Sequence, residues 1–215
     1  MAETKPVRID VVSDVVCPWC FIGKRRLEKA VALTPDVPIE VTYRPYFLND
    51  WIPREGMARA DYLTKKFGSP EAYRGMAERV ADNAAQEGLT YAIDKIARQP
   101  NTLDSHRLIH WAGKQGRGPE MKQRLMELYF TEGADLSDRE VLVRAAADIG
   151  MNADETRTRL ATDEAVAEIT ASALQAKEAG INGVPTFVVD ARYAISGAQA
   201  PETLAELIRK AASES

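Results

Sequence analysis

The chain has 215 residues, of which 45% are hydrophobic and 28% charged, and its net charge is −4 at pH 7. Such a composition predicts a globular protein with a sizeable buried core, and the acidic balance excludes the basic surface that nucleic acid requires. No apolar run reaches the length that spans a membrane. Residues 1–6 show neither the basic start nor the apolar stretch of a secretory signal, so we expect a cytoplasmic protein.

The N-terminal segment predicts a strand–helix–strand unit. Residues 7–12 and 39–43 are rich in β-branched side chains and are expected to be buried strands. Between them, Pro18 suits the first position of a helix that should run to about Leu33. Strands joined by a helix in this way are parallel, with a right-handed crossover.

The two cysteines of the chain, Cys17 and Cys20, lie at the start of this helix in the sequence Cys-Pro-Trp-Cys. Residues with this spacing share one face of a helix, so their sulfurs can form and break a disulfide. Free N–H groups at the helix start favour a thiolate at Cys17, which should be the attacking nucleophile. Cys20 should be more buried and act as the resolving thiol. Trp19 adds no charge, so we expect a reduction potential between about −120 and −270 mV.

Residues 56–164 are expected to form an all-helical insertion in a sheet domain built from residues 1–55 and 165–215. The pair Ser137 and Glu140 matches a capping box, which predicts that a helix begins there with Ser137 as its N-cap. Periodicity in the hydrophobic residues supports several helices. The predicted helices span residues 56–67, 70–86, 103–115, 119–131, 138–149 and 163–179.

Strand signals return near the C-terminus. Residues 186–190 and 193–196 are separated by a tight turn, which predicts an antiparallel hairpin, and Pro201 opens a last amphipathic helix. The order strand–helix–strand, many helices and strand–strand–helix predicts an α/β fold in which both ends of the chain contribute to one sheet.

Val184 and Pro185 precede the first strand of this hairpin. If that strand runs antiparallel to the first strand of the chain, the two residues lie beside Cys17. A proline cannot donate to the sheet at this position. We expect a cis Val184–Pro185 bond, with the Val184 backbone facing an incoming substrate.

These features together resemble a known family. The CPWC motif after a short first strand, the long helical stretch, residues 182–187 (NGVPTF) and residues 196–199 (SGAQ) are similar to the DsbA family of thioredoxin-fold oxidoreductases. The resemblance covers almost the whole chain and is closest to the FrnE-like branch, near 2-hydroxychromene-2-carboxylate isomerases and kappa-class glutathione transferases. It implies a thioredoxin-like fold with a large all-helical insertion and a cis proline at Pro185. It also implies a cleft lined by Gly197, Ala198 and Gln199.

The chain departs from this family behind the cysteines. Thioredoxin and DsbA carry a buried acid six residues before the first cysteine, where this chain has Val11. Asp14 is the nearest carboxylate and is either a proton acceptor for Cys20 or a turn residue, and we favour the turn. Pro18 and Trp19, between the cysteines, should tune the site. Some FrnE-like proteins also carry a C-terminal cysteine pair that this chain lacks.

Weaker signals lie in the helical stretch. His106 and His110 are one helical turn apart, but we expect polar helix positions and no metal site. The segment that begins at Asn101 resembles one that faces the active site in the family, so Asn101 and His106 are candidates for substrate contact. Asn101 is equally suited to a helix cap. The basic run at residues 24–26 should be a solvated helix face.

The sequence therefore predicts a dithiol–disulfide oxidoreductase without a bound cofactor. Its partner would be a thiol- or disulfide-containing substrate, protein or small molecule, and glutathione or a thioredoxin system could reset the pair. In a reducing cytoplasm, reduction or isomerisation should dominate over oxidation. The alternatives are a glutathione-dependent isomerase or transferase, whose members generally have Ser in place of Cys17, and a chaperone-like binding module. No nucleic acid or membrane partner is expected, and a homodimer is left open.

Overall fold

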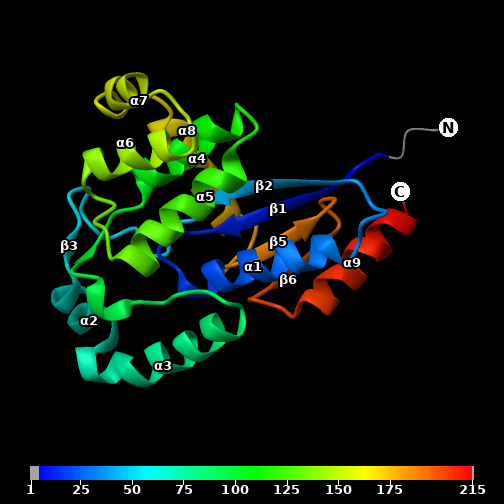
Figure 1. Cartoon of the computed structure of the whole chain (residues 1–215), viewed down its shortest axis with the longest axis horizontal. Coiled ribbons are helices and arrows are strands. Elements are labelled where there is room, and N and C mark those ends of the chain that lie inside the picture. Colours follow the sequence, from blue (N-terminus) through cyan, green and yellow to red (C-terminus); the bar gives the residue numbers. More distant parts are fainter. Residues whose placement is uncertain (1–4, 215) are drawn as a thin grey trace.

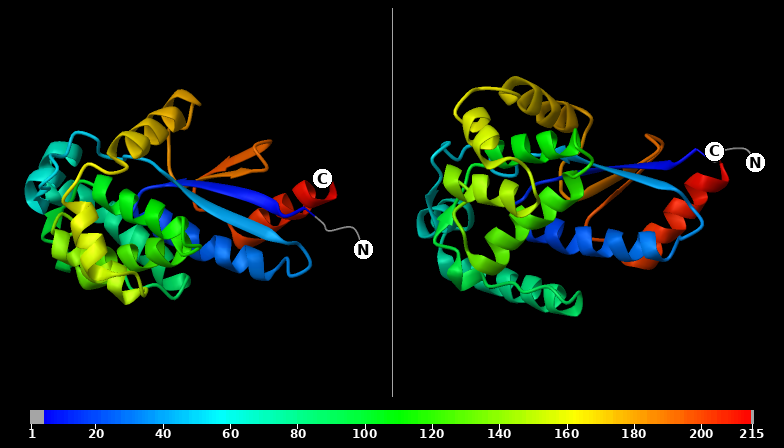
Figure 2. Two further views of the ribbon diagram at one scale, coloured as in Figure 1. Left: turned by 90° about the horizontal axis from the view of Figure 1, so that it is seen from above. Right: turned by 45° about the horizontal axis from the view of Figure 1, so that its top comes forward.

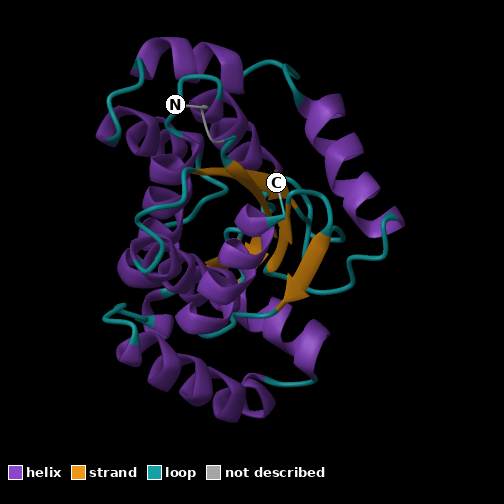
Figure 3. Cartoon of the chain, turned by 90° about the vertical axis from the view of Figure 1, so that its right-hand side faces the viewer, coloured by secondary structure: helices purple, strands orange, loops and turns teal. Residues whose placement is uncertain are grey.

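The computed structural model describes residues 5–214, so most of the residues on which the expected cytoplasmic location depends lie outside the described range. Within that range, no helix has the length and apolar character needed to cross a membrane. The described chain contains a central sheet surrounded by helices (Figure 3).

The central sheet has four strands in the order β2-β1-β5-β6 (Figure 1). The middle strand β1 (Val7–Ser13) pairs in parallel with β2 (Ile39–Pro45) and antiparallel with β5 (Thr186–Val189). The last strand β6 (Tyr193–Ser196) forms the expected hairpin with β5. Both ends of the chain thus build one sheet, which confirms the predicted α/β fold.

Two helices cover one face of this sheet. The first helix α1 (Pro18–Ala32) packs against the last helix α9 (Pro201–Ser213), and Leu27 and Leu204 belong to the apolar core that both share with β1 and β5. On the opposite side of the sheet, α8 (Val166–Glu178) lies against β2 (Figure 2).

The helices between β2 and α8 follow the predicted order with small shifts at their ends. The structure adds α7, which periodicity does not predict because its sequence (ADETRTRL) has no apolar stripe. The predicted N-cap at Ser137 is wrong. Asp138 caps the helix by accepting a hydrogen bond from the Glu140 N–H (2.9 Å). The elements are β3 (Met57–Ala58), α2 (Arg59–Phe67), α3 (Pro70–Gln86), the 3-10 turn η1 (Ile93–Lys95), β4 (Arg98–Gln99), α4 (Leu103–Gly113), α5 (Gly118–Glu127), the π-helical turn η2 (Leu128–Glu132), α6 (Arg139–Asp148) and α7 (Ala153–Leu160).

The helical insertion packs directly on the start of α1. The rings of Phe21 in α1 and Phe130 in η2 stack with their centroids 5.3 Å apart. Both belong to one apolar core that also includes Leu125 of α5 and Leu142 of α6, and Cys17 and Cys20 lie in the same core. The insertion therefore forms one wall of the surroundings of the cysteines.

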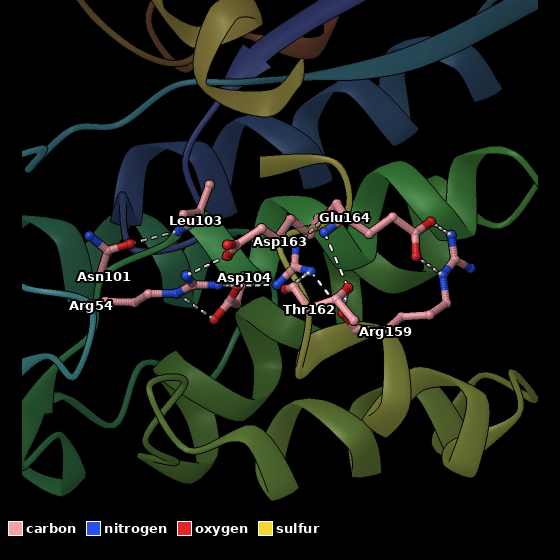
Figure 4. Close-up of polar contacts among 9 residues, drawn as sticks. Arg54, Asn101, Leu103, Asp104, Arg159, Thr162, Asp163 and Glu164 are labelled. Atoms are coloured by element: carbon pink, nitrogen blue, oxygen red, sulfur yellow. Dashed lines mark hydrogen bonds and ion pairs between the residues drawn. The ribbon is translucent and has the colours of Figure 1, made fainter. Parts of the chain in front are cut away.

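A buried arginine of α4, Arg107, holds the chain between α7 and α8. Figure 4 labels its partners Asp104, Arg159, Thr162 and Glu164. The Arg107 side chain is fully buried and donates to the carboxylate of Asp104 (2.7 Å). It also donates to the backbone carbonyls of Arg159 (2.8 Å), Thr162 (2.7 Å) and Glu164 (2.7 Å). One cation thus satisfies three carbonyls of an irregular segment.

Candidate active site

The two cysteines occupy the first turn of α1. Cys17 is the N-cap residue, Pro18 is the first helical residue, and the Cys17 carbonyl accepts the Cys20 N–H at 3.0 Å. Neither cysteine is in a disulfide. Cys17 is 4% exposed and Cys20 is 2% exposed, whereas Trp19 between them is 38% exposed. The intervening tryptophan therefore presents an apolar surface next to the pair.

The segment before β5 lies against Cys17. The β1–β5 register places Thr186 opposite Val12, so the residues just before Thr186 are near the cysteine turn. The Cys17 thiol donates to the carbonyl of Val184 at 3.5 Å. The Val184–Pro185 peptide bond is cis. A backbone carbonyl is thus directed at the sulfur of Cys17.

The loop after β6 lies beside this proline. The Gly197 N–H donates to the Pro185 carbonyl (2.7 Å), and Gly197 has a φ of +87°, which favours glycine. The Gln199 side chain turns back to the Ser196 carbonyl (2.6 Å). The carbonyl of Ala198 accepts from Arg26 of α1 (2.6 Å). The three residues implied by the resemblance are therefore fixed next to Pro185.

Gly23 of α1 allows the helix and the proline to approach closely, which the sequence did not reveal. A Cβ atom at this position would lie 2.8 Å from Cγ of Pro185 and 3.6 Å from Cα of Ala198. Only a residue without a side chain fits this contact. The signal is visible only once the fold brings residues 23 and 185 together.

The pKa values of the two thiols are shifted in opposite directions. The thiol of Cys20, which is hydrogen-bonded to the sulfur of Cys17, lowers the pKa of Cys17 below its ordinary value. Burial raises the pKa of Cys20 well above its ordinary value, and the contact with Cys17 adds to this. A reduced pair therefore ionises first at Cys17, which is the sulfur that lies at the helix N-terminus.

Asp14 lies in the turn just before the cysteines and is fully buried. Its carboxylate accepts the Leu48 N–H (2.8 Å) and lies 3.3 Å from Nε2 of His106. Burial alone would raise the pKa of Asp14, but the contact with His106, the hydrogen bond from the Leu48 N–H and the charge of Lys122 together hold the pKa below its ordinary value. Asp14 is thus an ionised group that ties the loop after β2 and helix α4 to the cysteine turn, and its charge opposes ionisation of Cys17.

The two candidate substrate contacts from the helical stretch are both engaged within the protein. The Asn101 side chain donates to the Ile52 carbonyl (2.7 Å) and accepts the Leu103 N–H (2.9 Å) at the start of α4 (Figure 4). His106 is buried beside Asp14, with its ring edge-on to Phe47 at 5.7 Å. Burial lowers the pKa of His106, which favours the neutral ring. A role in substrate contact stays a prediction for both residues.

The expectation of a solvated face for residues 24–26 is wrong for two of the three. Lys24 is buried and pairs with Glu28. Arg26 donates to Glu87 (2.6 Å) at the end of α3 and to the loop after β6. Arg26 thus fastens α1 to its neighbours, whereas the pair formed by Lys24 lies within α1 itself. Among residues 5–214, no cluster of His, Cys, Asp and Glu is suited to a metal ion.

The chain is similar to known proteins over most of its length. Residues 8–209 match the family described as "DSBA-like thioredoxin domain". A solved structure of a probable DsbA oxidoreductase from Streptomyces coelicolor shares 32% identity, with a TM-score of 0.88 over 97% of this chain and 91% of the other. The Bacillus subtilis protein YwbO is 26% identical over 185 residues, which are 85% of this chain and 86% of that protein.

More distant structures share the fold. A cytosolic disulfide reductase DsbM from Pseudomonas aeruginosa, solved with glutathione, has 17% identity and a TM-score of 0.68 over 94% of this chain and 98% of its own. The family resemblance predicted from the sequence is thus confirmed. The chain belongs to the DsbA-like thioredoxin domain family and is a thiol–disulfide oxidoreductase.

Proposed function

We propose that the protein exchanges dithiols and disulfides through Cys17 as the nucleophile and Cys20 as the resolving thiol. The observation that carries this proposal is the placement of both cysteines in the first turn of α1, with the Cys17 sulfur against the Val184 carbonyl. The lowered pKa of Cys17 and the raised pKa of Cys20 support the assignment of roles. The thiolate, not the thiol, attacks a disulfide, so the sulfur of Cys17 is the one prepared for attack at neutral pH. The neighbouring carbonyl of Val184 and the exposed Trp19 support substrate binding at this sulfur.

The reaction would proceed in two exchanges. The Cys17 thiolate attacks one sulfur of the substrate disulfide, the disulfide breaks, and the departing thiolate takes up a proton from solvent. Cys20 then loses its proton, and its sulfur attacks the sulfur of Cys17 in the mixed disulfide. This step releases the second substrate thiolate and leaves a Cys17–Cys20 disulfide. An external dithiol or glutathione supplies the two electrons that restore the pair.

We infer that reduction or isomerisation in the cytoplasm is the main direction. Both cysteines of the chain belong to the reactive pair, so none is left for a structural disulfide. Chains from reducing compartments commonly show this pattern. The test is the redox state of the pair trapped in intact cells by alkylation, where a mostly reduced pair is expected and a mostly oxidised pair would contradict the inference.

Two single variants test the mechanism. Cys17→Ser should abolish reduction of a peptide disulfide, whereas Cys20→Ser should accumulate a mixed disulfide that mass spectrometry detects on Cys17. Full turnover by Cys17→Ser would falsify the dithiol mechanism, and turnover that then depended on glutathione would support a glutathione-dependent isomerase or transferase instead.

The acidity of Cys17 gives a pH dependence with a defined sign. Because its pKa is lowered, alkylation of Cys17 should reach half of its maximal rate at a pH below the value of about 8.5 typical of a free thiol. Rapid labelling followed by peptide mass analysis separates the two cysteines. The same curve for Cys20 should begin at a much higher pH, and equal curves for both thiols would contradict the assignment of roles.

A further inference from the structure

Lys122 of α5 is a buried lysine that the steps described above do not use. Its side chain is 1% exposed, and Nζ has no hydrogen-bond partner among residues 5–214. Its neighbours in the helix, Met121 and Leu125, belong to the same apolar core as Cys20. A buried ammonium without a partner is costly, so its presence behind a reactive cysteine calls for an explanation.

The groups that face Lys122 come from several elements. The Tyr43 ring of β2 lies 5.8 Å from Nζ, within cation–π range. Negative charge on Cys20 favours the ammonium of Lys122 most, followed by negative charge on Asp14 and Cys17. The positive charge of Lys24 in α1 opposes this ammonium. Neutral His106 of α4 lies nearby. In return, the charge of Lys122 favours ionisation of Cys20. The charges of Cys20 and Lys122 therefore favour each other within one buried region.

A second lysine at the site is held quite differently. Lys24 is also buried, but its ammonium pairs with Glu28 one turn along α1. Because Glu28 already neutralises this charge, Lys24 has little effect on the ionisation of the two thiols. Behind the cysteines, the buried side chain of Val11 supplies no ionisable group. Within the described part of the helical insertion, Lys122 is the buried cation whose charge acts on Cys20. Lys66 of α2, which is less buried, interacts with Cys17 and Asp14 instead.

We propose that Lys122 stabilises the thiolate of Cys20 at the moment when this sulfur attacks the mixed disulfide. The inference rests on the dithiol mechanism proposed above and adds the group that makes its second step accessible. The thiol of Cys20 is difficult to ionise because burial opposes a lone negative charge. A nearby ammonium offsets that cost, and the charge is then passed to the departing substrate thiolate, which leaves with it. Lys122 acts through Cys20 and need not touch the substrate.

Titration of Cys20 alone tests the electrostatic part. In a Cys17→Ser background, the ultraviolet absorbance of the Cys20 thiolate is followed against pH with and without Lys122→Met, a substitution of similar length that lacks the charge. We expect about tenfold less thiolate at a given pH below the midpoint after Lys122→Met. Lys24→Met in the same background should change the thiolate fraction less than twofold. An unchanged curve with Lys122→Met would overturn the proposal.

The resolving step itself gives the second test. A mixed disulfide between Cys17 and a small aromatic thiol is formed, and release of that thiol is timed across the pH range. Lys122→Met should slow release by about tenfold at neutral pH, with the loss shrinking at high pH, while attack by Cys17 changes little. Equal slowing at every pH would indicate a structural effect and overturn the proposal.

A measurement on the unsubstituted protein covers the case in which a variant does not fold. The lysine side chains are followed by carbon NMR in the reduced and in the oxidised protein. Oxidation removes the ionisable thiols of Cys17 and Cys20, whose charges favour the ammonium, so the buried lysine should titrate at a lower pH in the oxidised form. Identical titrations would overturn the role of Lys122, whereas failure of the pair to cycle with glutathione would instead refute the proposed function.

Discussion

The helical insertion buries two cations in opposite ways. Near α8, Arg107 is surrounded by a carboxylate and three backbone carbonyls, and each of these four acceptors is within hydrogen-bond distance. Behind the cysteines, Lys122 has an aromatic ring at 5.8 Å and no hydrogen bond from the described residues. The charge of Arg107 is thus fully occupied by hydrogen-bond acceptors, and we call this the saturated site. The charge of Lys122 has no such partner and can act on a neighbouring group, and we call this the unsaturated site.

The difference separates what holds the fold from what serves the reaction. A saturated buried cation stabilises the segment around it, and its removal leaves several groups without partners. An unsaturated one destabilises the fold, since burial lowers the pKa of Lys122 from 10.5 to about 8. Proteins tolerate such local conflicts mainly at functional sites. Loss of Arg107 should therefore lower the stability of the fold, whereas loss of Lys122 should raise the stability and slow the reaction.

The largest expected effect is on stability at the saturated site. Arg107→Met should lower the free energy of unfolding by about 3–5 kcal/mol, because a buried guanidinium and its hydrogen bonds to Asp104 and three backbone carbonyls are lost. Arg54 still donates to Asp104 (2.9 Å) in this variant, so the loss falls mainly on the irregular segment between α7 and α8. Urea unfolding followed by circular dichroism measures the change. The acidity of Cys17 should stay the same in the fraction that remains folded.

A partly exposed arginine in the same insertion is the control. Arg124 of α5 donates to Glu132 (2.5 Å) and Asp148 (2.7 Å), but water screens these pairs. Arg124→Met should therefore cost less than about 1 kcal/mol. Similar losses for Arg107→Met and Arg124→Met would show that burial does not distinguish the two sites.

The next effect has the opposite sign. Lys122→Met should raise the free energy of unfolding at neutral pH by up to ~3 kcal/mol, the equivalent of a pKa lowered from 10.5 to about 8. Between these two pH values the unfolded chain binds the lysine proton and the folded chain releases it, so the stability of the unsubstituted protein rises with pH. The advantage of the variant should therefore be complete below pH 8 and disappear as the pH approaches 10.5. Loss of stability in Lys122→Met at neutral pH would contradict this account.

The smallest expected effect on stability concerns packing rather than charge. It involves the contact between Gly23 of α1 and Pro185. Gly23→Ala should lower stability by ~1 kcal/mol, since overpacking costs about 1–3 kcal/mol and the gain in helix propensity offsets about 1 kcal/mol. It should also slow disulfide reduction, because the ring of Pro185 must shift. Gly75→Ala in α3 is the matched control, because a Cβ atom added there would have no described atom within 4 Å outside its own helix. It should stabilise the protein by about 0.5–1 kcal/mol without a change in rate.

Local signals account for most of the fold that the sequence predicted. The strands, the helix start at Pro18 and the hairpin before α9 each follow from neighbouring residues. Helix α7 was not predicted because its polar sequence has no apolar face. The strands β3 and β4 were not predicted because two residues are too few to show an alternating pattern. Asp138 replaces Ser137 as a cap because either residue type suits that role, and only the backbone geometry distinguishes them.

The site divides in the same way. Cys17, Cys20 and Pro185 are recognisable because the motif that contains each is continuous in the sequence. Contacts between distant elements were not predictable, such as those that bring Leu48 and His106 to Asp14. Lys122 occurs in an amphipathic helix, where a lysine usually marks the solvent side, and only the tertiary packing shows that it points inward.

The contacts of Arg26 connect helix α3 with the loop after β6. One guanidinium in α1 holds the end of α3 through Glu87 and the loop after β6 through the carbonyl of Ala198. A rigid, planar fork cannot follow one partner without straining the other. Any outward swing of α3 therefore pulls on the loop that borders Pro185. The position of α3 is in this way coupled through one side chain to the loop beside the proline that lies next to Cys17.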